Sequence, residues 1–537
     1  MSGARVRSYW GWGFEDAQPT ADEIARTVKR FGPILGRRAD EVKARTPRPL
    51  DEVDFPAPRI AAPANAELAA LVSAERRDRA AHAYGRSFAD VLRGFCGDYP
   101  HPPDLVARPR DERELLALLE WCSDQRVAAI PYGGGSSVVG GVEADVGDAY
   151  AGAMCIDLGA FDRLLEVDQR SRAARIQAGI LGPALEDALR PHDLTLRHFP
   201  QSFELSSLGG WIATRAGGHF ATLHTHIDDF VESLRVVTPR GTLETRRLPG
   251  SGAGPSPDRM FIGSEGTLGI ITEAWMRLQA RPRFRAKASA AFTRFDDAVE
   301  ATRAVAQSGL YPANCRLLDG GEAFASRASK DGSSVLLLAF ESADHDVAPL
   351  LARAVEIARA HGGRVEIAEG AQGAAREEDG AAAKAWRETF LRAPYLLNTA
   401  VAIGVVADTF ETAITWDRFA DFHEHVTRAV GKALGEVAGG GFVMCRFTHV
   451  YPDGPAPYYT FVAPAPEGAQ LDVWRAAKQA AGEAVVSAGG TITHHHAVGR
   501  LHKPYYEKQR PELFADALRA AKAALDPQGI LNPGVLL

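Results

Sequence analysis

The chain has 537 residues, of which 46% are hydrophobic and 24% are charged. This composition excludes intrinsic disorder as the default and allows two or more packed cores. The formal net charge of −7 is small for the length, with both signs interspersed, so we expect no nucleic acid as a partner.

The cysteines and the apolar runs indicate where the chain resides. The five cysteines are an odd number without a CxxC pair, which favours reduced thiols and a cytoplasmic location. The N-terminus lacks the apolar core of a signal peptide. The longest apolar stretch, residues 396–406, is far shorter than the ~20 residues that a membrane-spanning helix needs. We therefore expect at most peripheral contact with a membrane.

The first clear elements lie between residues 20 and 137. Thr20 and Glu23 form a capping box before an amphipathic pattern, which predicts a helix over 20–31. A second helical pattern begins at Asp111 and leads into a buried strand at 127–130. That strand ends in a glycine loop, Pro131-Tyr-Gly-Gly-Gly-Ser-Ser137.

Two further regions follow the loop. Short apolar runs separated by glycine turns continue to about residue 280, as in an α+β domain, whereas helical patterns at 296–307 and 347–361 predict a second domain. We expect four parts: an N-terminal helical and extended region (1–99), a cofactor-binding domain (100–281), a cap domain for the substrate (282–500), and a C-terminal segment returning to the cofactor domain (501–537).

The glycine loop has the composition of an anion-binding site. Without Cβ atoms, backbone N–H groups can approach a diphosphate closely, and the two serines add hydroxyl donors. In isolation a triple glycine is equally consistent with a tight turn. The candidate cofactor residues here are Pro131, Tyr132, Gly133, Gly134, Gly135, Ser136 and Ser137.

Two other segments share the loop's small, polar character. The first contributes Gln201, Ser202, Ser206, Ser207, Gly210, Thr214, Ala216 and Gly217, whose hydroxyls and amides suit a flavin. The second contributes Glu265, Gly266, Thr267, Leu268, Gly269, Ile270 and Ile271. Three such segments in one domain imply one extended ligand. None is a GxGxxG motif that opens a helix, which argues against a Rossmann site for NAD.

Together these segments resemble the flavin-binding signature of the vanillyl-alcohol-oxidase superfamily. The matching motifs are PYGGGSS, SSLGGW with TRAGG, GSEGTLGIIT and the terminal DPQGILNPG. The resemblance implies an α+β, two-domain vanillyl-alcohol-oxidase-type fold, with a PCMH-type FAD-binding domain and an α+β cap domain. Many members attach the flavin to a histidine near the glycine loop. Residues 131–141 contain neither histidine nor cysteine, so we expect FAD to bind non-covalently.

Motifs along nearly the whole chain narrow the resemblance to the alkyldihydroxyacetonephosphate synthase family. They include Trp10-Gly-Trp-Gly13, Cys315-Arg-Leu-Leu-Asp319, Thr415-Trp-Asp-Arg418 and His494-His-His-Ala-Val-Gly499. The resemblance implies exchange of the acyl group of acyl-dihydroxyacetone phosphate for a fatty alcohol, the step that makes the ether bond of ether lipids. It also implies a redox-neutral reaction through a covalent adduct at flavin N5.

The resemblance implies a role for each of several site residues, and each of these roles has a structural alternative. Arg446 matches the phosphate anchor, although buried arginines also pair with carboxylates for structural reasons. Arg316 matches a required arginine that binds substrate directly or acts structurally through Asp319 or Asp417.

Tyr458 matches the catalytic acid/base, and strand geometry places it on the face opposite Tyr459. Acting at working pH requires a neighbouring cation to lower its pKa from ~10. The alternative is a core tyrosine with a satisfied hydroxyl.

The three consecutive histidines, His494, His495 and His496, are candidate catalytic residues. In an extended segment His494 and His496 share one face, a familiar metal-binding arrangement. No third ligand is evident in the sequence, so we expect no metal and favour proton transfer by the imidazoles. His449 and the histidines of segment 219–226 depart from the family's pattern.

The expected partners are lipids. We expect an apolar tunnel lined by residues 396–406 and Phe410 to hold the long chains, and we expect a homodimer. The alternative function is an FAD-dependent dehydrogenase or oxidase of a 2-hydroxy acid or alcohol, which would use the same FAD segments with a histidine base. Fold alone does not separate the two.

Overall fold

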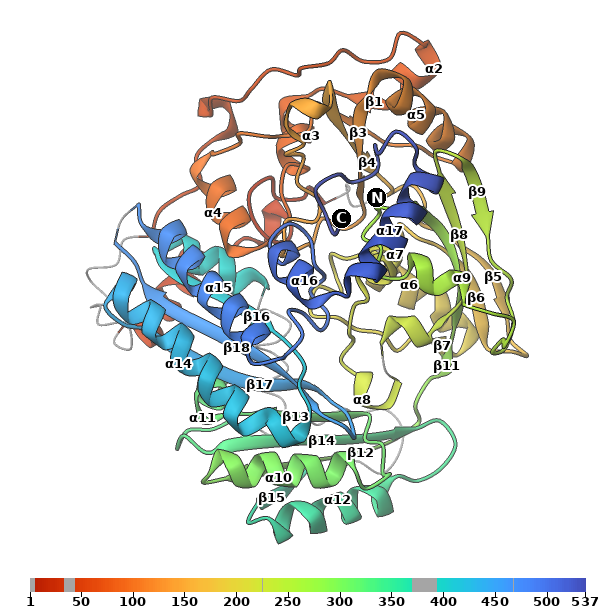
Figure 1. Ribbon diagram of the computed structural model, residues 1–537. Helices are drawn as coiled ribbons and strands as arrows, with labels where there is room; N and C mark the ends of the chain where they lie inside the picture. Colours follow the sequence, from red (N-terminus) through yellow and green to blue (C-terminus); the bar gives the residue numbers. More distant parts are fainter. Residues whose placement is uncertain (1–4, 33–43, 225, 369–393, 467) are drawn as a thin grey trace.

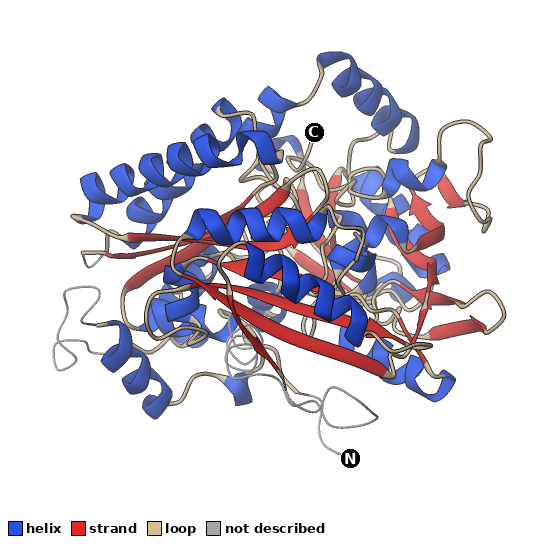
Figure 2. Ribbon diagram, turned by 90° about the horizontal axis from the view of Figure 1, so that it is seen from below, coloured by secondary structure: helices blue, strands red, loops and turns tan. Residues whose placement is uncertain are grey.

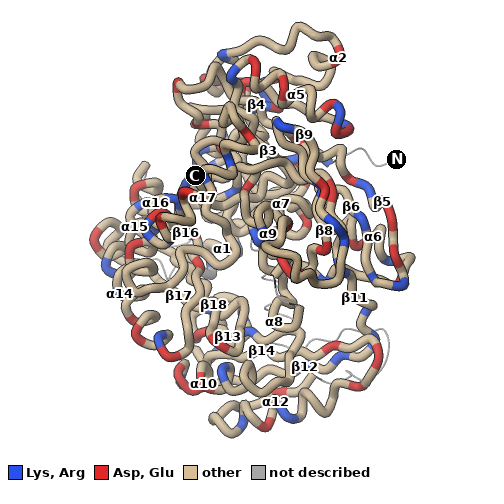
Figure 3. Tube along the Cα trace, turned by 45° about the vertical axis from the view of Figure 1, so that its right-hand side comes forward, with Lys and Arg blue, Asp and Glu red and all other residues tan. Residues whose placement is uncertain are grey.

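The computed structural model describes residues 5–32, 44–224, 226–368, 394–466 and 468–537. The chain forms two α+β domains (Figure 1), which confirms the expected fold class. No helix among these residues is long and apolar enough to cross a membrane. Acidic and basic residues are interspersed over both domains (Figure 3), as the small net charge leads one to expect.

The first domain contains two main sheets. The smaller has the order β1-β2-β4-β3, in which β2, β4 and β3 are parallel. The larger is antiparallel with the order β5-β6-β10-β8-β9, and β7 pairs with β11 beside it. The strands are β1 (Val72–Ser73), β2 (Leu105–Ala107), β3 (Val127–Tyr132), β4 (Gly152–Asp157), β5 (Leu164–Asp168), β6 (Ala173–Gln177), β7 (Leu194–Thr195), β8 (Val231–Thr238), β9 (Gly241–Glu244), β10 (Ile270–Arg277) and β11 (Gln279–Ala280).

Several helices in the N-terminal half of the chain begin at side-chain caps. Thr20 and Glu23 form the predicted capping box of α1, and the Asp111 side chain caps α5. The helices are α1 (Ala21–Phe31), α2 (Ala66–Ala69), α3 (Arg76–Ala81), α4 (Phe88–Cys96), α5 (Glu112–Gln125), α6 (Gly182–Leu189), α7 (Leu208–Thr214), α8 (Ala221–His224) and α9 (Pro257–Phe261).

The second domain is built on one antiparallel sheet of seven strands, ordered β15-β12-β14-β13-β17-β18-β16. Its strands are β12 (Phe284–Phe292), β13 (Asn314–Leu318), β14 (Ser334–Ser342), β15 (Arg364–Ile367), β16 (Val405–Glu411), β17 (Phe442–Val450) and β18 (Pro455–Pro464). Its helices are α10 (Phe295–Ala306), α11 (Gly320–Ala325), α12 (Ala348–Ala360), α14 (Phe419–Ala438) and α15 (Gln470–Ser487).

The two faces of this sheet differ in character because side chains alternate along each strand. Phe447, Tyr459 and Phe461 lie on one face, in the same apolar core as Phe419 and Phe422 of α14. Figure 2 shows long helices lying against the strands. The opposite face carries polar side chains of β13, β17 and β18 and turns toward the first domain.

The C-terminal segment, with α16 (Lys503–Gln509) and α17 (Glu512–Leu525), returns to the first domain. Leu531 forms a parallel bridge with Ala129 of β3. The ammonium of Lys522 donates to the carbonyl oxygen of Thr267 at 2.7 Å. Within the first domain, the last residues described therefore join β3 to the segment that contains Thr267.

Candidate active site

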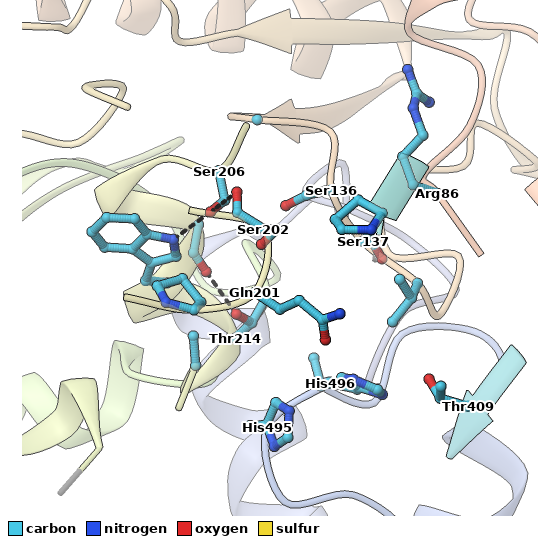
Figure 4. A pocket seen from close by; sticks show the side chains of 18 of the residues that line it. Arg86, Ser136, Ser137, Gln201, Ser202, Ser206, Thr214, Thr409, His495 and His496 are labelled. Carbon is cyan, nitrogen blue, oxygen red and sulfur yellow. Dashed lines mark hydrogen bonds between the residues drawn. The ribbon is translucent and has the colours of Figure 1, made fainter. Parts of the chain in front are cut away.

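A cavity of about 500 Å³ lies between the first domain and the polar face of the seven-stranded sheet. Its wall brings together all three small-residue segments predicted from the sequence. In Figure 4 Ser136 and Ser137 lie on one side, His495 and His496 lie across from them, and the Gln201 side chain points into the space between.

The glycine loop follows directly from β3 and packs against the second segment. A Cβ on Gly134 would lie 2.0 Å from the carbonyl oxygen of Leu205, and one on Gly133 would lie 2.2 Å from Oγ of Ser207. Gly135 has a φ of +64°, which favours glycine. The loop therefore needs glycine both for close packing and for its conformation. All seven predicted residues, Pro131 to Ser137, line the cavity.

The second segment is held by its own hydroxyl groups. Oγ of Ser207 accepts from the backbone N–H of Gly210 at the start of α7, and Oγ of Ser206 accepts from the indole of Trp211 at 2.7 Å. The hydroxyl of Thr214 donates to the Gly210 carbonyl at 2.8 Å. The predicted residues of this segment, from Gln201 to Gly217, all line the cavity.

The third segment lines the cavity only in part. Glu265, Gly266, Gly269, Ile270 and Ile271 face it, but Thr267 and Leu268 are absent from its wall. The Thr267 hydroxyl donates to the Ser264 carbonyl, and Leu268 is fully buried in the apolar core of the first domain. Both side chains turn inward, and the contact of these two residues with the cofactor stays a prediction.

The carboxylate of Glu265 joins this segment to the chain after the histidines. It accepts hydrogen bonds from the backbone N–H groups of Val498 and Gly499, both at 2.8 Å. Burial raises the pKa of Glu265 to about 7 despite these bonds. Its side chain therefore positions a neighbouring loop.

An extended dinucleotide such as FAD fits these walls. The glycine loop presents backbone where a Cβ would collide, so a ligand can approach the main chain closely. Asn532, from the terminal motif, also lines the cavity, and its buried Oδ1 has no hydrogen-bond partner within the described part of the chain. This free acceptor is the kind of group that a bound ligand satisfies.

The sheet face opposite these segments carries Arg446 and Tyr458 side by side. The two residues are register partners in β17 and β18, and the Arg446 guanidinium carbon lies 4.0 Å from the centre of the Tyr458 ring. The Tyr458 hydroxyl donates to Oγ1 of Thr409 at 2.9 Å. Tyr459 points into the core, as strand geometry predicted.

The pKa of Tyr458 differs from the expectation. Burial raises it to about 12, and the neighbouring Arg446 only partly opposes this effect. The neighbouring cation therefore lowers the pKa, as expected, but not below the usual tyrosine value of ~10, because the effect of burial is larger. The phenol is protonated at neutral pH and can donate a hydrogen bond or a proton.

Both predicted arginines line the cavity, and Arg446 also has a structural partner. Its Nη1 lies 3.2 Å from Oε2 of Glu322, while its buried Nε lacks a hydrogen-bond partner among the described residues. Arg316 is 1% exposed and donates to the Thr448 carbonyl at 3.4 Å. Of the two proposed aspartate partners, Asp319 accepts from the backbone of Glu322 and Cys445.

The three histidines form a bent loop rather than an extended strand. His495 and His496 line the cavity, with ring centres 5.9 and 5.4 Å from that of Tyr458. His494 lies outside the cavity wall, and its Nε2 is 2.9 Å from the Tyr451 hydroxyl. The expected pairing of His494 with His496 on one face was therefore wrong.

Glu411 holds this loop, and the sequence alone gave no sign of it. Its carboxylate is 1% exposed at the side-chain level and accepts hydrogen bonds from the backbone N–H groups of His494, His495 and His496. The Thr493 hydroxyl also donates to it, at 2.5 Å. Burial acts to raise its pKa, but the pairing with the His495 imidazole holds the pKa well below the usual range. Glu411 lies opposite Tyr458 in the register of β16 and β18, so one strand pair positions both groups.

Residues of the run 396–406 line the cavity, as expected, whereas Phe410 does not, and the tunnel for lipid chains stays a prediction. Leu396, Leu397, Ala400, Ile403 and Val405 line the cavity. Phe410 instead stacks on Tyr459 in the core, with ring centres 4.8 Å apart. The alternation of β16 turns Ala407 and Thr409, on the face opposite Phe410, toward the cavity.

Other lining residues escaped the sequence analysis. Trp12 and Asn532 lie in motifs that were recognised without being placed at the site, so those motifs were the available signal. Arg86, Glu322 and Thr460 lie outside the recognised motifs. Their contribution depends on contacts between segments far apart in the chain.

Comparison with known proteins agrees with this arrangement. Residues 103–246 match the FAD binding domain family, and residues 281–536 match the C-terminal domain of FAD linked oxidases. The alkyldihydroxyacetonephosphate synthase of Dictyostelium discoideum is 30% identical over 475 residues, covering 86% of this chain and 77% of the relative.

Two further similarities describe the range of related enzymes. Glycolate oxidase subunit GlcD of Bacillus subtilis is 27% identical over 445 residues, covering 81% of this chain and 89% of the relative. A solved structure of an alkyldihydroxyacetonephosphate synthase superposes with a TM-score of 0.80 over 98% of both chains at 24% identity. The latter likeness establishes the shared fold.

Proposed function

Because this chain belongs to the alkyldihydroxyacetonephosphate synthase family, we propose that it exchanges the acyl group of an acyl-dihydroxyacetone phosphate for a fatty alcohol. One observation carries the proposal: Arg446, Arg316 and Tyr458 share the sheet face opposite the three cofactor segments, with His495 and His496 beside them in the same cavity. This arrangement supports a role for the two arginines in binding an anion, beside a phenol and imidazoles that line the same cavity.

The arginines hold the phosphate in this proposal. A guanidinium can form two parallel hydrogen bonds to phosphate oxygens, and Nε of Arg446 is available for one of them. Glu322 keeps the guanidinium oriented. Anchoring the phosphate fixes the position of the three-carbon unit relative to Tyr458.

Proton transfer falls to Tyr458 and the histidine loop. The Tyr458 phenol, protonated at neutral pH, donates to the leaving fatty-acid carboxylate. Burial lowers the pKa of His496 well below its usual range, so its imidazole is neutral and can accept the proton of the incoming alcohol. Glu411 orients the imidazoles of His495 and His496 by accepting hydrogen bonds from the backbone N–H groups of these two residues. FAD, held non-covalently by the three cofactor segments, would supply a reactive ring nitrogen for the exchange.

The two domains divide this work. We propose that residues 100–281, with the C-terminal segment, hold the cofactor and that residues 282–500 hold the lipid. The apolar run 396–406 binds the alkyl chains. These chains enter the cavity from a membrane surface, and this entry requires no membrane-spanning helix of the protein. We propose a cytoplasmic homodimer that associates peripherally with that membrane.

The test is product analysis with the FAD-loaded protein. It receives a long-chain acyl-dihydroxyacetone phosphate and a fatty alcohol whose hydroxyl carries an oxygen isotope label, and lipids are examined by mass spectrometry after alkaline hydrolysis. Before hydrolysis we expect one equivalent of free fatty acid per ether lipid formed, and after hydrolysis an alkali-stable lipid that retains the label. The absence of labelled ether lipid would contradict the proposal.

A second function has a specific observation in its favour. The similarity to glycolate oxidase subunit GlcD extends over most of both chains, and the same cavity could place a hydroxy acid beside the imidazoles. Anaerobic addition of small 2-hydroxy acids distinguishes the two functions, because a dehydrogenase would lose its yellow colour as the flavin is reduced. For the synthase we expect the flavin spectrum to persist.

A further inference from the structure

Three imidazoles meet beside the cavity in a manner that the sequence did not indicate. His449 of β17, His494 and His495 each contribute a ring nitrogen, and these atoms all lie within 4.8 Å of one another. His449 and His495 also line the cavity. The third ligand missing from the histidine triplet in the sequence is thus supplied by a strand more than forty residues away.

The surroundings of His449 leave one nitrogen free for a ligand. Its Nε2 lies 3.1 Å from the carbonyl oxygen of Gly218, and a carbonyl can only accept, so Nε2 carries the proton. The lone pair is then on Nδ1. This atom is buried and has no hydrogen-bond partner within the described segments, and the residue is 3% exposed. A buried lone pair without a partner indicates a place for a ligand.

The partners of the other two imidazoles resemble those of metal-bound histidines. Oε2 of Glu411 lies 3.3 Å from Nδ1 of His495, and carboxylates in this position commonly orient a metal-binding imidazole. The Tyr451 hydroxyl and Nε2 of His226 flank Nε2 of His494 at 2.9 and 3.0 Å. The other ring nitrogen of His494, Nδ1, therefore faces His495 and lies 3.1 Å from Nδ1 of that residue.

Charge at the cluster also suits a cation. The buried carboxylate of Glu411 lies beside the cluster, with Oε2 3.3 Å from Nδ1 of His495. A carboxylate beside the imidazoles partly compensates the charge of a divalent ion.

We propose that His449, His494 and His495 form a binding site for one divalent transition-metal ion of the zinc class. Imidazole nitrogens suit zinc, nickel and copper, and three protein ligands leave a coordination position open. Because His449 and His495 line the cavity, that position takes an oxygen ligand from the cavity, such as water or an anionic oxygen of a bound molecule.

The test uses the FAD-loaded protein after chelator treatment and dialysis, with Co²⁺ and Zn²⁺ as probes. Co²⁺ is expected to give ligand-field absorption at wavelengths beyond the flavin bands, with one ion bound per chain, and Zn²⁺ is expected to displace it. Neither measurement requires turnover, so the outcome is independent of the proposed transferase activity. Failure of the wild-type protein to bind either ion overturns the proposal.

Two variants locate the bound ion. His449→Gln should weaken Zn²⁺ binding by more than about tenfold, since even outer partners of metal ligands contribute that much. His361→Gln, at the end of α12 and bonded to Ile357, is the matched control and should bind as the wild type does. Equal affinity in both variants overturns the proposal.

A measurement on the wild type covers the case in which the His449 variant fails to fold. X-ray absorption at the zinc edge should count three imidazole nitrogens at about 2.0 Å. Ligation by sulfur, or by fewer than three imidazoles, would place the ion elsewhere and overturn the proposal.

Discussion

Tyr458 and Tyr459 are adjacent in the chain but lie in different environments. Tyr458 faces the cavity, with Arg446 over its ring, whereas Tyr459 is buried in the core, where its hydroxyl pairs with Nδ1 of His423 at 3.2 Å. A strand sends successive side chains to opposite faces, so this difference follows from position alone. The effect of replacing a tyrosine at the site can therefore be compared with the effect of replacing a tyrosine in the core.

Replacing the two tyrosines separately tests the role of the cavity phenol. Tyr458→Phe should lower transferase turnover by at least about 100-fold, because positioned acid or base groups contribute that much or more. FAD content should not change, since the hydroxyl bonds to Thr409. Tyr459→Phe should keep most of the activity. Both are measured by steady-state kinetics on protein of matched flavin content, and equal losses in the two variants would argue against a catalytic phenol.

Glu265 should make stability depend on pH. Its pKa in the folded protein is raised to about 7, against ~4.3 in an unfolded chain, so folding favours its protonated form. The stability from this group is full below the unfolded pKa and is lost as pH rises through about 7. The slope cannot exceed about 1.4 kcal/mol per pH unit for one proton.

The Glu265→Gln variant isolates that effect. Its urea midpoint should decline less steeply than that of the wild type between about pH 5 and pH 7, because the amide does not titrate. The measurement is urea denaturation of the FAD-loaded protein at several pH values. Parallel declines in both proteins would mean that other groups cause the dependence.

At the scale of elements, the histidine loop depends on a strand remote from it in the chain. Three consecutive backbone N–H groups converge on the carboxylate of Glu411 in β16. This convergence bends the loop and turns His495 and His496 toward the cavity, whereas His494 lies outside the cavity wall. A local pattern of three histidines contains no information about the bend, since the acceptor lies about eighty residues earlier.

Glu411→Gln should disturb the loop while preserving the shape of the side chain. The amide replaces one acceptor oxygen with a donor, so at least one buried N–H group loses its partner at a cost of about 1–3 kcal/mol. We expect a lower thermal midpoint and a strong loss of turnover. Glu424→Gln, on the exposed side of α14, is the control and should change neither. An unaltered thermal midpoint in the Glu411 variant would show that the loop does not rely on this carboxylate.

At the scale of the whole molecule, the C-terminal segment closes the cofactor domain. The ammonium of Lys522 donates to the carbonyl oxygens of Thr267 and Leu531, both at 2.7 Å, and to the carboxylate of Asp526 at 2.6 Å. Asn532 donates from its amide to the carbonyls of Gly141 and Glu265. One short stretch of chain thereby ties two of the three cofactor segments together.

Lys522→Met should therefore loosen cofactor binding. Removing the cation leaves the buried carboxylate of Asp526 with only the backbone donors of Ile530 and Leu531 and takes the ammonium donor from two carbonyls, which costs about 3 kcal/mol. We expect flavin fluorescence to appear at a lower temperature during heating, as FAD is released earlier. Arg519→Met, on the same helix with an exposed side chain, is the control. Release at the same temperature in both variants would contradict this role.

The sequence by itself determined the elements and most of the cofactor wall. Capping at Thr20 and Asp111, the alternation of β18 and the glycines of the loop are local properties, and each was predicted because it depends on residues a few positions apart. The resemblance supplied the roles assigned to Arg446 and Tyr458, which local patterns could not distinguish from core residues.

Only the tertiary structure decided the environment of those residues. The carboxylate under the histidine loop, the partner of Arg446, the raised pKa of Tyr458 and the meeting of His449 with His494 and His495 all join segments far apart in the chain. Burial and pairing depend on which elements pack together, and side-chain periodicity carries no such information. Chemistry that depends on desolvation and on distant partners is therefore visible only once the chain is folded.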